Sequence, residues 1–297
     1  MNFRESCLPP GWYPRNPDEI SRFLLSFAES GFAEAGGAGG AKAWGSVSAA
    51  IAPHAGWFYS GKIAARAVAS LDRKADTVVV IGGHLPEGYP PLFAMEDAVN
   101  TPFGGASQSD AMTIDAKLRE TMYKKIKGRP DQYPDNTVEV LLPMVRFFMP
   151  NAALLWIRLP ADMASFDSGK ALAQAAKDLG RNIVVLGSTD LTHYGPNYGY
   201  APKGIGPQAL KWVKEVNDRK FIEAVESGDP QTVLERAESD LSSCSAGAVL
   251  GAMGYAAAIN AGPARLLEYS TSADAMDTAA IPDSFVGYAA FSVSSEQ

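Results

Sequence analysis

Basic residues are the minority among the charged residues of this 297-residue chain. There are 26 Lys and Arg against 33 Asp and Glu, and the formal net charge is −7. The sequence also lacks any run of five or more like charges. Because nucleic-acid binding needs a basic face that neutralises phosphates, this balance argues against DNA or RNA as the main partner.

Long hydrophobic runs are also missing. No apolar stretch reaches the length of a bilayer-spanning helix, and the N-terminal segment "MNFRESCLPPGWYPRN" lacks the apolar core of a signal peptide. We therefore expect a cytoplasmic protein that does not contact a membrane. In that compartment its two cysteines, Cys7 and Cys244, would stay reduced, which leaves Cys244 free for other chemistry.

Several motifs of familiar enzymes are absent. The chain has no Gly-x-Ser-x-Gly elbow, no HExxH and no CxxC pair. The run "GGAGG" lacks the strand before it and the helix after it that a phosphate-binding loop requires. The chemistry must therefore be sought elsewhere in the chain.

Short apolar runs alternate with amphipathic helical patterns. The runs predict buried strands at 47–53, 76–83, 153–159, 182–188 and 285–293. Helices are predicted at 60–71, 137–149, 166–180, 207–227, 230–239 and 244–261. This alternation predicts one α/β domain over residues 1–297, with a central mixed, mostly parallel sheet flanked by helices on both faces. The Gly/Ala-rich segment 35–44 predicts a flexible loop, and the segments 93–97 and 272–285 are candidates for antiparallel edge strands.

The chain has only three histidines, and each comes just beyond a predicted buried strand: His54, His84 and His193. Ligands of open α/β sheets bind at the carboxyl ends of strands, so three separate elements would deliver imidazoles to one edge. Any one such histidine is more often packed or solvated, but three at equivalent positions favour a common site. Because histidine is the commonest metal ligand and a frequent acid–base group, a metal site is the leading hypothesis.

Three further residues are candidates for the same site. Asp190 would share a face with His193 if their turn is helical, and its carboxylate suits metal ligation, support of a ligand or proton transfer. The alternative is that it caps a short helical turn. Cys244 opens a predicted helix, where a thiolate is favoured, although a free cysteine is as often a small buried apolar residue. Glu139 lies among apolar neighbours and faces either a pocket or solvent.

Seven short motifs occur in order along the chain: "PHAGWFYSG", "IGGH", "TPFGG", "VEVLLPM", "STDLTHYG", "CSAGAVLGAM" and "FVGYAAFSV". With them the chain resembles the Memo family, the B component of the AmmeMemoRadiSam group, from "GWYP" near the N-terminus to the last strand. The resemblance implies a fold similar to the class III (LigB-type) extradiol dioxygenases, which are non-haem iron enzymes. It also implies radical-SAM and AMMECR1-like partner proteins.

The resemblance further implies that His54, His84 and Cys244 ligate a metal, iron or copper in that family. Asp190 and His193 would line the same cavity. The chain departs from the family pattern E-H-S-[IL]-E at residues 135–139, where Asn136 replaces a pocket histidine and cannot exchange a proton near neutral pH. Trp57 also replaces the usual tyrosine after the PHAG motif.

Two histidines and one anionic ligand leave coordination positions open, as in facial-triad Fe(II) oxygenases, although a thiolate shifts preference toward Cu(I) or Zn(II). We therefore expect a mononuclear non-haem oxidoreductase that uses O₂ and an aromatic or peptide-borne substrate, with Fe(II) favoured over Cu or Zn. His193, steered by Asp190, would move protons. The substrate would contact Trp57, Tyr59, Asn136 and Glu139. The alternatives are a non-catalytic metal-binding or peptide-interaction protein, which Asn136 favours, and zinc hydrolysis.

Overall fold

The computed structural model describes residues 1–34, 47–103, 111–276 and 281–294, so the predicted loop at 35–44 lies outside the described residues. The strands are β1 (Phe3–Arg4), β2 (Ala49–Ala52), β3 (Thr77–Leu85), β4 (Leu92–Phe93), β5 (Ala98–Val99), β6 (Met112–Thr113), β7 (Arg129–Pro130), β8 (Ala153–Pro160), β9 (Ile183–Ser188), β10 (His193–Tyr194), β11 (Arg265–Thr271) and β12 (Phe285–Val293). The helices are α1 (Pro17–Glu34), α2 (Trp57–Ser70), α3 (Ala116–Lys125), α4 (Asn136–Glu139), α5 (Leu142–Phe148), α6 (Ala164–Asp178), η2 (Pro196–Tyr198), α7 (Pro207–Trp212), η3 (Val213–Asn217), α8 (Asp218–Ser227), α9 (Pro230–Ser239) and α10 (Ala246–Ala258). No helix in these described ranges is both long enough and apolar enough to cross a bilayer.

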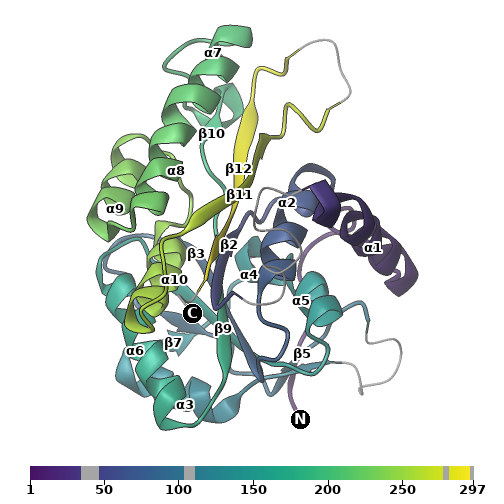
Figure 1. Cartoon of the computed structure of the whole chain (residues 1–297), viewed down its shortest axis with the longest axis vertical. Coiled ribbons are helices and arrows are strands. Elements are labelled where there is room, and N and C mark those ends of the chain that lie inside the picture. The colour runs from purple at the N-terminus through teal and green to yellow at the C-terminus, as the bar shows by residue number, and fades with distance from the viewer. Residues whose placement is uncertain (35–46, 104–110, 277–280, 295–297) are drawn as a thin grey trace.

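A mixed sheet of nine strands forms the centre of the described structure (Figure 1). Its order is β10-β12-β2-β9-β3-β8-β4-β7, and β11 pairs with β12. The central strands β2, β9, β3 and β8 are parallel, whereas β12 is antiparallel to β2, and β4 is antiparallel to β8. The predicted fold class is confirmed: an α/β domain whose mixed sheet is parallel at its centre and carries helices on both faces.

The central strands supply two hydrophobic cores, one on each face of the sheet. On β3, Val78 and Val80 pack with residues of α1, α2 and α5, while Val79 and Ile81 pack with residues of α6, α8, α9 and α10. Figure 1 shows these two groups of helices on opposite sides of the sheet. Because successive side chains point to opposite faces and both faces are covered, the strand is apolar throughout. Continuous apolar runs in the sequence are therefore a reliable sign of these strands.

Some elements differ from their predicted form. The helix predicted at 137–149 is two helices, α4 and α5, because Pro143 near the start of α5 has no N–H with which to continue α4. The helix predicted at 207–227 contains the π-helical turn η3. Strand β11 was not predicted, since its half-exposed residues interrupt any apolar run. The described part of 272–285 holds no edge strand, since only Phe285 lies in a strand, β12, so that prediction is wrong and the antiparallel edge is β11. Strand β4 overlaps the other candidate segment at Phe93.

Glycines bring α10 close to α6 and to the end of β8. A Cβ at Gly254 would lie 1.9 Å from the Phe166 carbonyl oxygen, and one at Gly247 would lie 2.0 Å from the Pro160 carbonyl oxygen. Only glycine permits such an approach between two backbones. The contact at Gly247, in the first turn of α10, holds the start of this helix against the carboxyl end of β8. Cys244 lies just before that start.

Asp218, at the start of α8, is fully buried, and its carboxylate lies against Gly287 of β12. Its Oδ1 accepts hydrogen bonds from the backbone N–H of Thr192, at 3.1 Å, and from the Thr192 hydroxyl, and its Oδ2 accepts one from the Tyr269 hydroxyl at 2.7 Å. Burial raises the pKa of Asp218 to about 6 in spite of these hydrogen bonds. The folded protein therefore binds a proton here more tightly than the unfolded chain does.

This shift predicts a pH-dependent difference between the wild type and Asp218→Asn. The Asp218 contribution to the free energy of unfolding is fully present below about pH 4 and is lost as the pH rises through about 6. Asp218→Asn has no such loss, so it should gain up to about 3 kcal/mol relative to the wild type between pH 4 and pH 7. Urea unfolding curves across this range measure the gain, and a difference that stays constant with pH would contradict the prediction.

Candidate metal centre

His54 directly follows Pro53 at the end of β2, and its side chain is buried, with 1% exposed. Its Nδ1 lies 2.9 Å from the hydroxyl of Ser188, which ends the neighbouring parallel strand β9. Its backbone N–H donates to Asp190 Oδ1 at 2.7 Å, and its carbonyl accepts from the Asn136 side-chain amide at 2.9 Å. Because Nδ1 is engaged by Ser188, Nε2 is the nitrogen left to bind a ligand.

His84, near the end of β3, is held by an ion pair behind it. Its φ of 56° lies in the left-handed region, which residues with a side chain seldom adopt. Its Nδ1 lies 3.0 Å from Asp135 Oδ2, and the same oxygen lies 3.1 Å from Arg158 Nη2. The His84 and His54 rings meet nearly at right angles, with centroids 4.9 Å apart. A carboxylate on one ring nitrogen orients an imidazole so that the other nitrogen can bind a metal.

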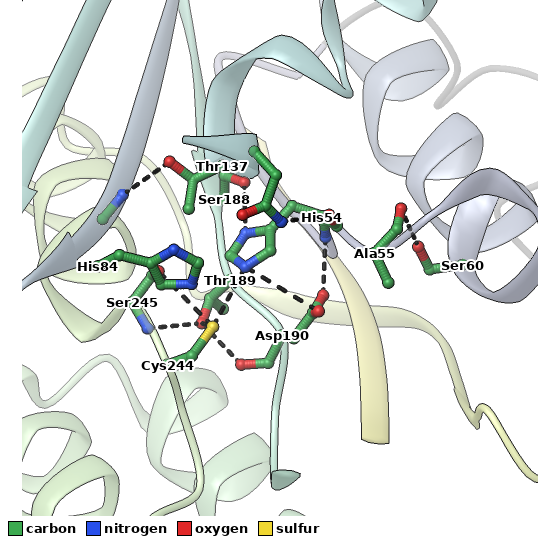
Figure 2. A network of polar contacts seen from close by, with 12 residues as sticks. His54, Ala55, Ser60, His84, Thr137, Ser188, Thr189, Asp190, Cys244 and Ser245 are labelled. Atoms are coloured by element: carbon green, nitrogen blue, oxygen red, sulfur yellow. Dashed lines mark hydrogen bonds and ion pairs between the residues drawn. The ribbon is translucent and has the colours of Figure 1, made fainter. Parts of the chain in front are cut away.

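Cys244 joins these two rings from the loop before α10. Its backbone N–H donates to the Asp190 carbonyl at 3.2 Å, and its Sγ lies 3.2 Å from His54 Nε2. Figure 2 shows the sulfur facing both imidazole rings. One ligand atom each from His54, His84 and Cys244 lies within 4.8 Å of the other two. The three residues that the sequence predicted to meet do lie together.

The distances and charges of this group fit a metal ion. Metal–nitrogen bonds are about 2.0 Å and metal–sulfur bonds about 2.3 Å long, so a nitrogen and a sulfur on one ion lie at most about 4.4 Å apart, and the 3.2 Å between His54 Nε2 and Cys244 Sγ is within that limit. Burial raises the pKa of the Cys244 thiol, but the imidazoles of His54 and His84 outweigh burial and hold that pKa well below its usual value. The thiolate is the form of cysteine that ligates metals. Two imidazoles and one thiolate suit zinc, copper and iron.

The imidazoles respond to the same charges. Burial lowers the pKa of His54, but Asp190 and the Cys244 sulfur outweigh it and raise that pKa above the usual value. Burial likewise acts to lower the pKa of His84, while Asp135 and Cys244 raise it to about 10. Burial raises the pKa of Asp135, yet His84 and Arg158 bring it down to about 2. The Cys244 thiolate and the Asp135 carboxylate therefore favour a positive charge on or beside the His84 ring, which contacts both.

Gly83 allows β3 to approach the loop that carries Cys244. A Cβ at this position would lie 2.4 Å from the Cβ and 2.9 Å from the Cα of Ser245. We expect Gly83→Ala to displace Ser245 and Cys244 and to weaken metal binding about 10- to 100-fold, as changes to the supports of metal ligands do. Competition with a chromophoric chelator measures this affinity. Gly56→Ala is the matched control, because its Cβ would make only an ordinary contact of 3.6 Å; equal affinities of both variants would contradict the prediction.

A cavity of about 1050 Å³ opens onto this centre. The residues predicted for the site that line it are His54, His84, Asp190, His193, Tyr59 and Asn136. Asp190 and His193 do not lie on a helical turn, so neither the helix cap nor the shared helix face forms. Instead, the Asp190 carboxylate accepts a hydrogen bond from the backbone N–H of His54. Burial raises the pKa of the Asp190 carboxyl. The His193 ring packs edge-on against Tyr198, with centroids 5.0 Å apart.

Trp57 corrects one prediction, because it is a core residue and does not line the cavity. Its side chain is 4% exposed, its indole N–H donates to the Val140 carbonyl at 2.9 Å, and its ring packs 5.1 Å from that of Phe23. The expected contact with substrate is therefore wrong. Trp57 begins α2, and residues two apart on a helix point in different directions, so Tyr59 reaches the cavity while Trp57 faces the core.

Glu139 corrects a second prediction, because it lies beneath the N-terminal arm. Its carboxylate accepts hydrogen bonds from the Ser6 hydroxyl, from the backbone N–H groups of Cys7 and Leu8, at 2.8 and 3.2 Å, and from the Tyr13 hydroxyl at 2.8 Å. Burial raises its pKa, but these donors outweigh burial and hold the pKa below its usual value. Glu139 thus anchors the arm and does not line the cavity, so the predicted substrate contact is wrong.

Three supporting residues were not predicted as part of the site. They are Asp135 and Arg158 behind His84, and Ser188 behind His54. Arg158 had a visible sign, since it is the one charge in the apolar run "ALLWIRL" of β8. A charged residue is almost never fully buried unless it is paired, so a partner was to be expected. The sequence contains no comparable sign for Ser188.

Comparisons with known proteins show the family of this chain. The family model described as "Memo-like protein" matches residues 4–292. This chain belongs to the Memo family. Among the Memo relatives, a MEMO1 family protein of Pyrococcus abyssi is 30% identical over 282 residues, which cover 90% of this chain and 92% of that protein. A MEMO1 family protein of Thermococcus onnurineus is 28% identical over 82% of this chain and 85% of its own.

Among solved structures, an uncharacterized protein of Escherichia coli K12 is similar with a TM-score of 0.47 and 13% identity, over 82% of this chain and 98% of that one. At this level the likeness adds nothing to the assignment of this Memo protein.

Proposed function

We propose that this protein is a mononuclear non-haem oxidoreductase that holds a metal with His54, His84 and Cys244. Fe(II) is the favoured metal, and Cu and Zn are the alternatives. The observation that carries the proposal is that two imidazoles and a thiolate from three separate parts of the chain meet within 4.8 Å beside a cavity of about 1050 Å³. Three protein ligands leave coordination positions free, and a site with free positions is typical of metal catalysis.

The substrate would be a flat aromatic molecule or a peptide that carries one. A redox metal bound here would supply electron exchange with O₂. Tyr59 and Tyr198, which are 42% and 47% exposed, offer ring faces on the cavity wall against which a substrate can stack. His193 is the group placed to accept or return a proton from a substrate hydroxyl, with Asp190 beside it in the same cavity. Ser188 and Asp135 would keep the two ligand rings in place.

The test is oxygen consumption by the protein after anaerobic loading with Fe(II). A panel of catechols and indoles is added, and O₂ uptake is compared with that of the apo-protein. We expect uptake above the apo-protein with at least one ring type. His193→Ala should keep the metal and lose about 100-fold or more of the rate, as removal of an acid–base group does. No uptake with any member of the panel would contradict an oxygenase.

One observation favours a second candidate, a metal-binding or peptide-interaction protein without turnover. The Asn136 amide lines the cavity but is engaged with the His54 carbonyl, at 2.9 Å, and it has no proton to transfer. Binding of an aromatic ligand without O₂ uptake would favour this candidate. Radical-SAM and AMMECR1-like proteins are proposed as partners from the family resemblance, and co-purification of the untagged chain with them tests that proposal.

A further inference from the structure

The outer wall of the cavity, formed by Tyr59, Tyr198 and Asp283, is aromatic and acidic. All three side chains are exposed, and all three line the same cavity as the metal centre. Behind them, buried Tyr288 faces the same space: burial raises its pKa, and the neighbours that raise it further include Asp190, Tyr198 and Tyr59. A substrate bound at the metal would extend along these rings.

Lysine and arginine are missing from the described lining of this cavity. No Lys or Arg is found among the described residues that line it, whose polar members are His, Asp, Asn, Ser and Tyr. Proteins recognise carboxylates and phosphates mainly with Arg, Lys or free backbone N–H groups. An anionic substituent on the substrate would therefore find no side-chain counter-charge away from the imidazoles and the metal.

Three N–H groups in the first turn of α2 are not free to replace the missing cation. Ala55 and Gly56 line the cavity just before this helix, and a helix N-terminus can bind anions through its free N–H groups. Here the Trp57 N–H donates to the Trp12 carbonyl at 2.7 Å. The N–H groups of Tyr59 and Ser60 donate to the Gly56 carbonyl at 2.9 and 3.2 Å. These donors are already used within the protein.

Two aspartates, by contrast, line the cavity. Buried Asp190 lies beside the metal ligands, exposed Asp283 lies on the outer wall, and the whole chain carries a net charge of −7. A cationic group on the substrate would meet the Asp283 carboxylate and the faces of Tyr59 and Tyr198, which attract cations. A carboxylate at the same position would be repelled by Asp283 and would have no Lys or Arg of the described lining as a counter-charge.

We infer that the cavity selects aromatic ligands whose substituent remote from the metal is cationic or neutral, and that it rejects the same ligands when that substituent is a carboxylate. This inference rests on the proposed function, because it takes the aromatic ring to bind at the metal centre. It adds the charge of the substrate, which the metal ligands alone do not determine.

Three matched catechols test the inference. The compounds 4-(2-aminoethyl)catechol, 4-ethylcatechol and 3,4-dihydroxyphenylacetate share the ring and differ in side-chain charge, +1, 0 and −1. Their affinities for the anaerobic Fe(II)-loaded protein are measured by calorimetry at low salt. We expect the ammonium compound to bind at least about fivefold tighter than the carboxylate, with the neutral compound between them, and the ratio to shrink at high salt. Equal or tighter binding of the carboxylate would overturn the inference.

Two variants separate the cavity from the net charge. Asp283→Asn should weaken binding of the ammonium compound and strengthen binding of the carboxylate compound, so that the ratio of their affinities falls about threefold or more. Asp178→Asn makes the same change of charge on the exposed face of α6, outside the cavity, and should leave the ratio unchanged. An equal fall in both variants would overturn the inference. If all three compounds bind with equal affinity, this inference is wrong but the proposed function stands. If 4-ethylcatechol does not bind, the proposal of an aromatic substrate is wrong, and this inference is wrong with it.

Discussion

Replacing His54 by alanine should abolish stoichiometric metal binding. Its Nε2 lies 3.2 Å from Cys244 Sγ, and its ring is buried and fixed through Nδ1 by Ser188, so the substitution removes one of the three ligands. The two protein ligands that remain do not hold a metal ion against chelators. Loss of a residue that supports a ligand costs up to roughly 100-fold in metal affinity, and we expect the loss of a ligand itself to cost more. Elemental analysis after Fe(II) loading and gel filtration measures the stoichiometry.

His193→Ala is the matched control for this loss. His193 lines the same cavity and is also an imidazole, but it is not a member of the cluster formed by His54, His84 and Cys244. It should retain one equivalent of metal while His54→Ala retains less than about a tenth. One equivalent of iron on His54→Ala, or loss of metal from His193→Ala, would show that the ligand set is different.

Replacing Arg158 by methionine should destabilise the protein by about 3 to 5 kcal/mol, the usual cost of breaking a buried charge network from one side. Arg158 is 4% exposed, and its guanidinium contacts Asp135 at 3.1 Å, Asp131 at 3.3 Å and the Gly83 carbonyl at 3.0 Å. Without it, the buried carboxylate of Asp131 and the largely buried carboxylate of Asp135 lose a counter-charge. Asp131 keeps Arg4, 3.6 Å away, but Asp135 keeps only the His84 imidazole among charged partners within 4 Å in the described part of the chain.

The same substitution should also weaken metal binding, because Arg158 holds the carboxylate that orients His84. We expect a loss of about 10- to 100-fold in affinity. Urea unfolding of the apo-protein and chelator competition of the loaded protein measure the two effects. The control is Arg66→Met, whose partially exposed pair with Glu268 at 2.7 Å should contribute under about 1 kcal/mol. Similar unfolding energies for both variants would contradict the role of Arg158.

Should Arg158→Met fail to fold, Arg158→Lys gives a second measurement. It keeps one positive charge but cannot make the three guanidinium contacts together. We expect a smaller loss of stability than in Arg158→Met. Metal binding should still be weaker than in the wild type, since a single ammonium cannot hold Asp135 and the Gly83 carbonyl in the same geometry. Metal affinity equal to that of the wild type would show that His84 does not depend on this residue.

The parallel centre of the sheet could be predicted from the sequence because its evidence is local. Strands β2, β3, β8 and β9 are buried on both faces, so each one is a short continuous apolar run with turn residues at its end. The carboxyl end of each strand follows from chain direction alone. For that reason the positions of His54, His84 and His193 just after strands already indicated one edge of the sheet.

The directions of individual side chains could not be predicted in the same way. Trp57 and Tyr59 are two residues apart on one helix, and only the packing of Phe23 against α2 shows which of them faces the core. Glu139 looked like a pocket residue because its neighbours are apolar. Its partners lie more than 125 residues away in the N-terminal arm, and no local pattern records a contact at that separation.

The sequence by itself determined that this protein is built from buried strands alternating with helices, and that His54 and His84 lie near the carboxyl ends of strands, because periodicity and turn residues act over a few positions. Only the tertiary structure decided that β2, β9 and β3 are neighbours, which brings His54, Asp190 and His84 to adjacent strand ends. It also decided that the close packing of α10 at its glycines delivers Cys244 to them. Strand order and helix packing depend on contacts between residues that are far apart in the sequence. These contacts form only when the chain folds, so no local sequence pattern records them.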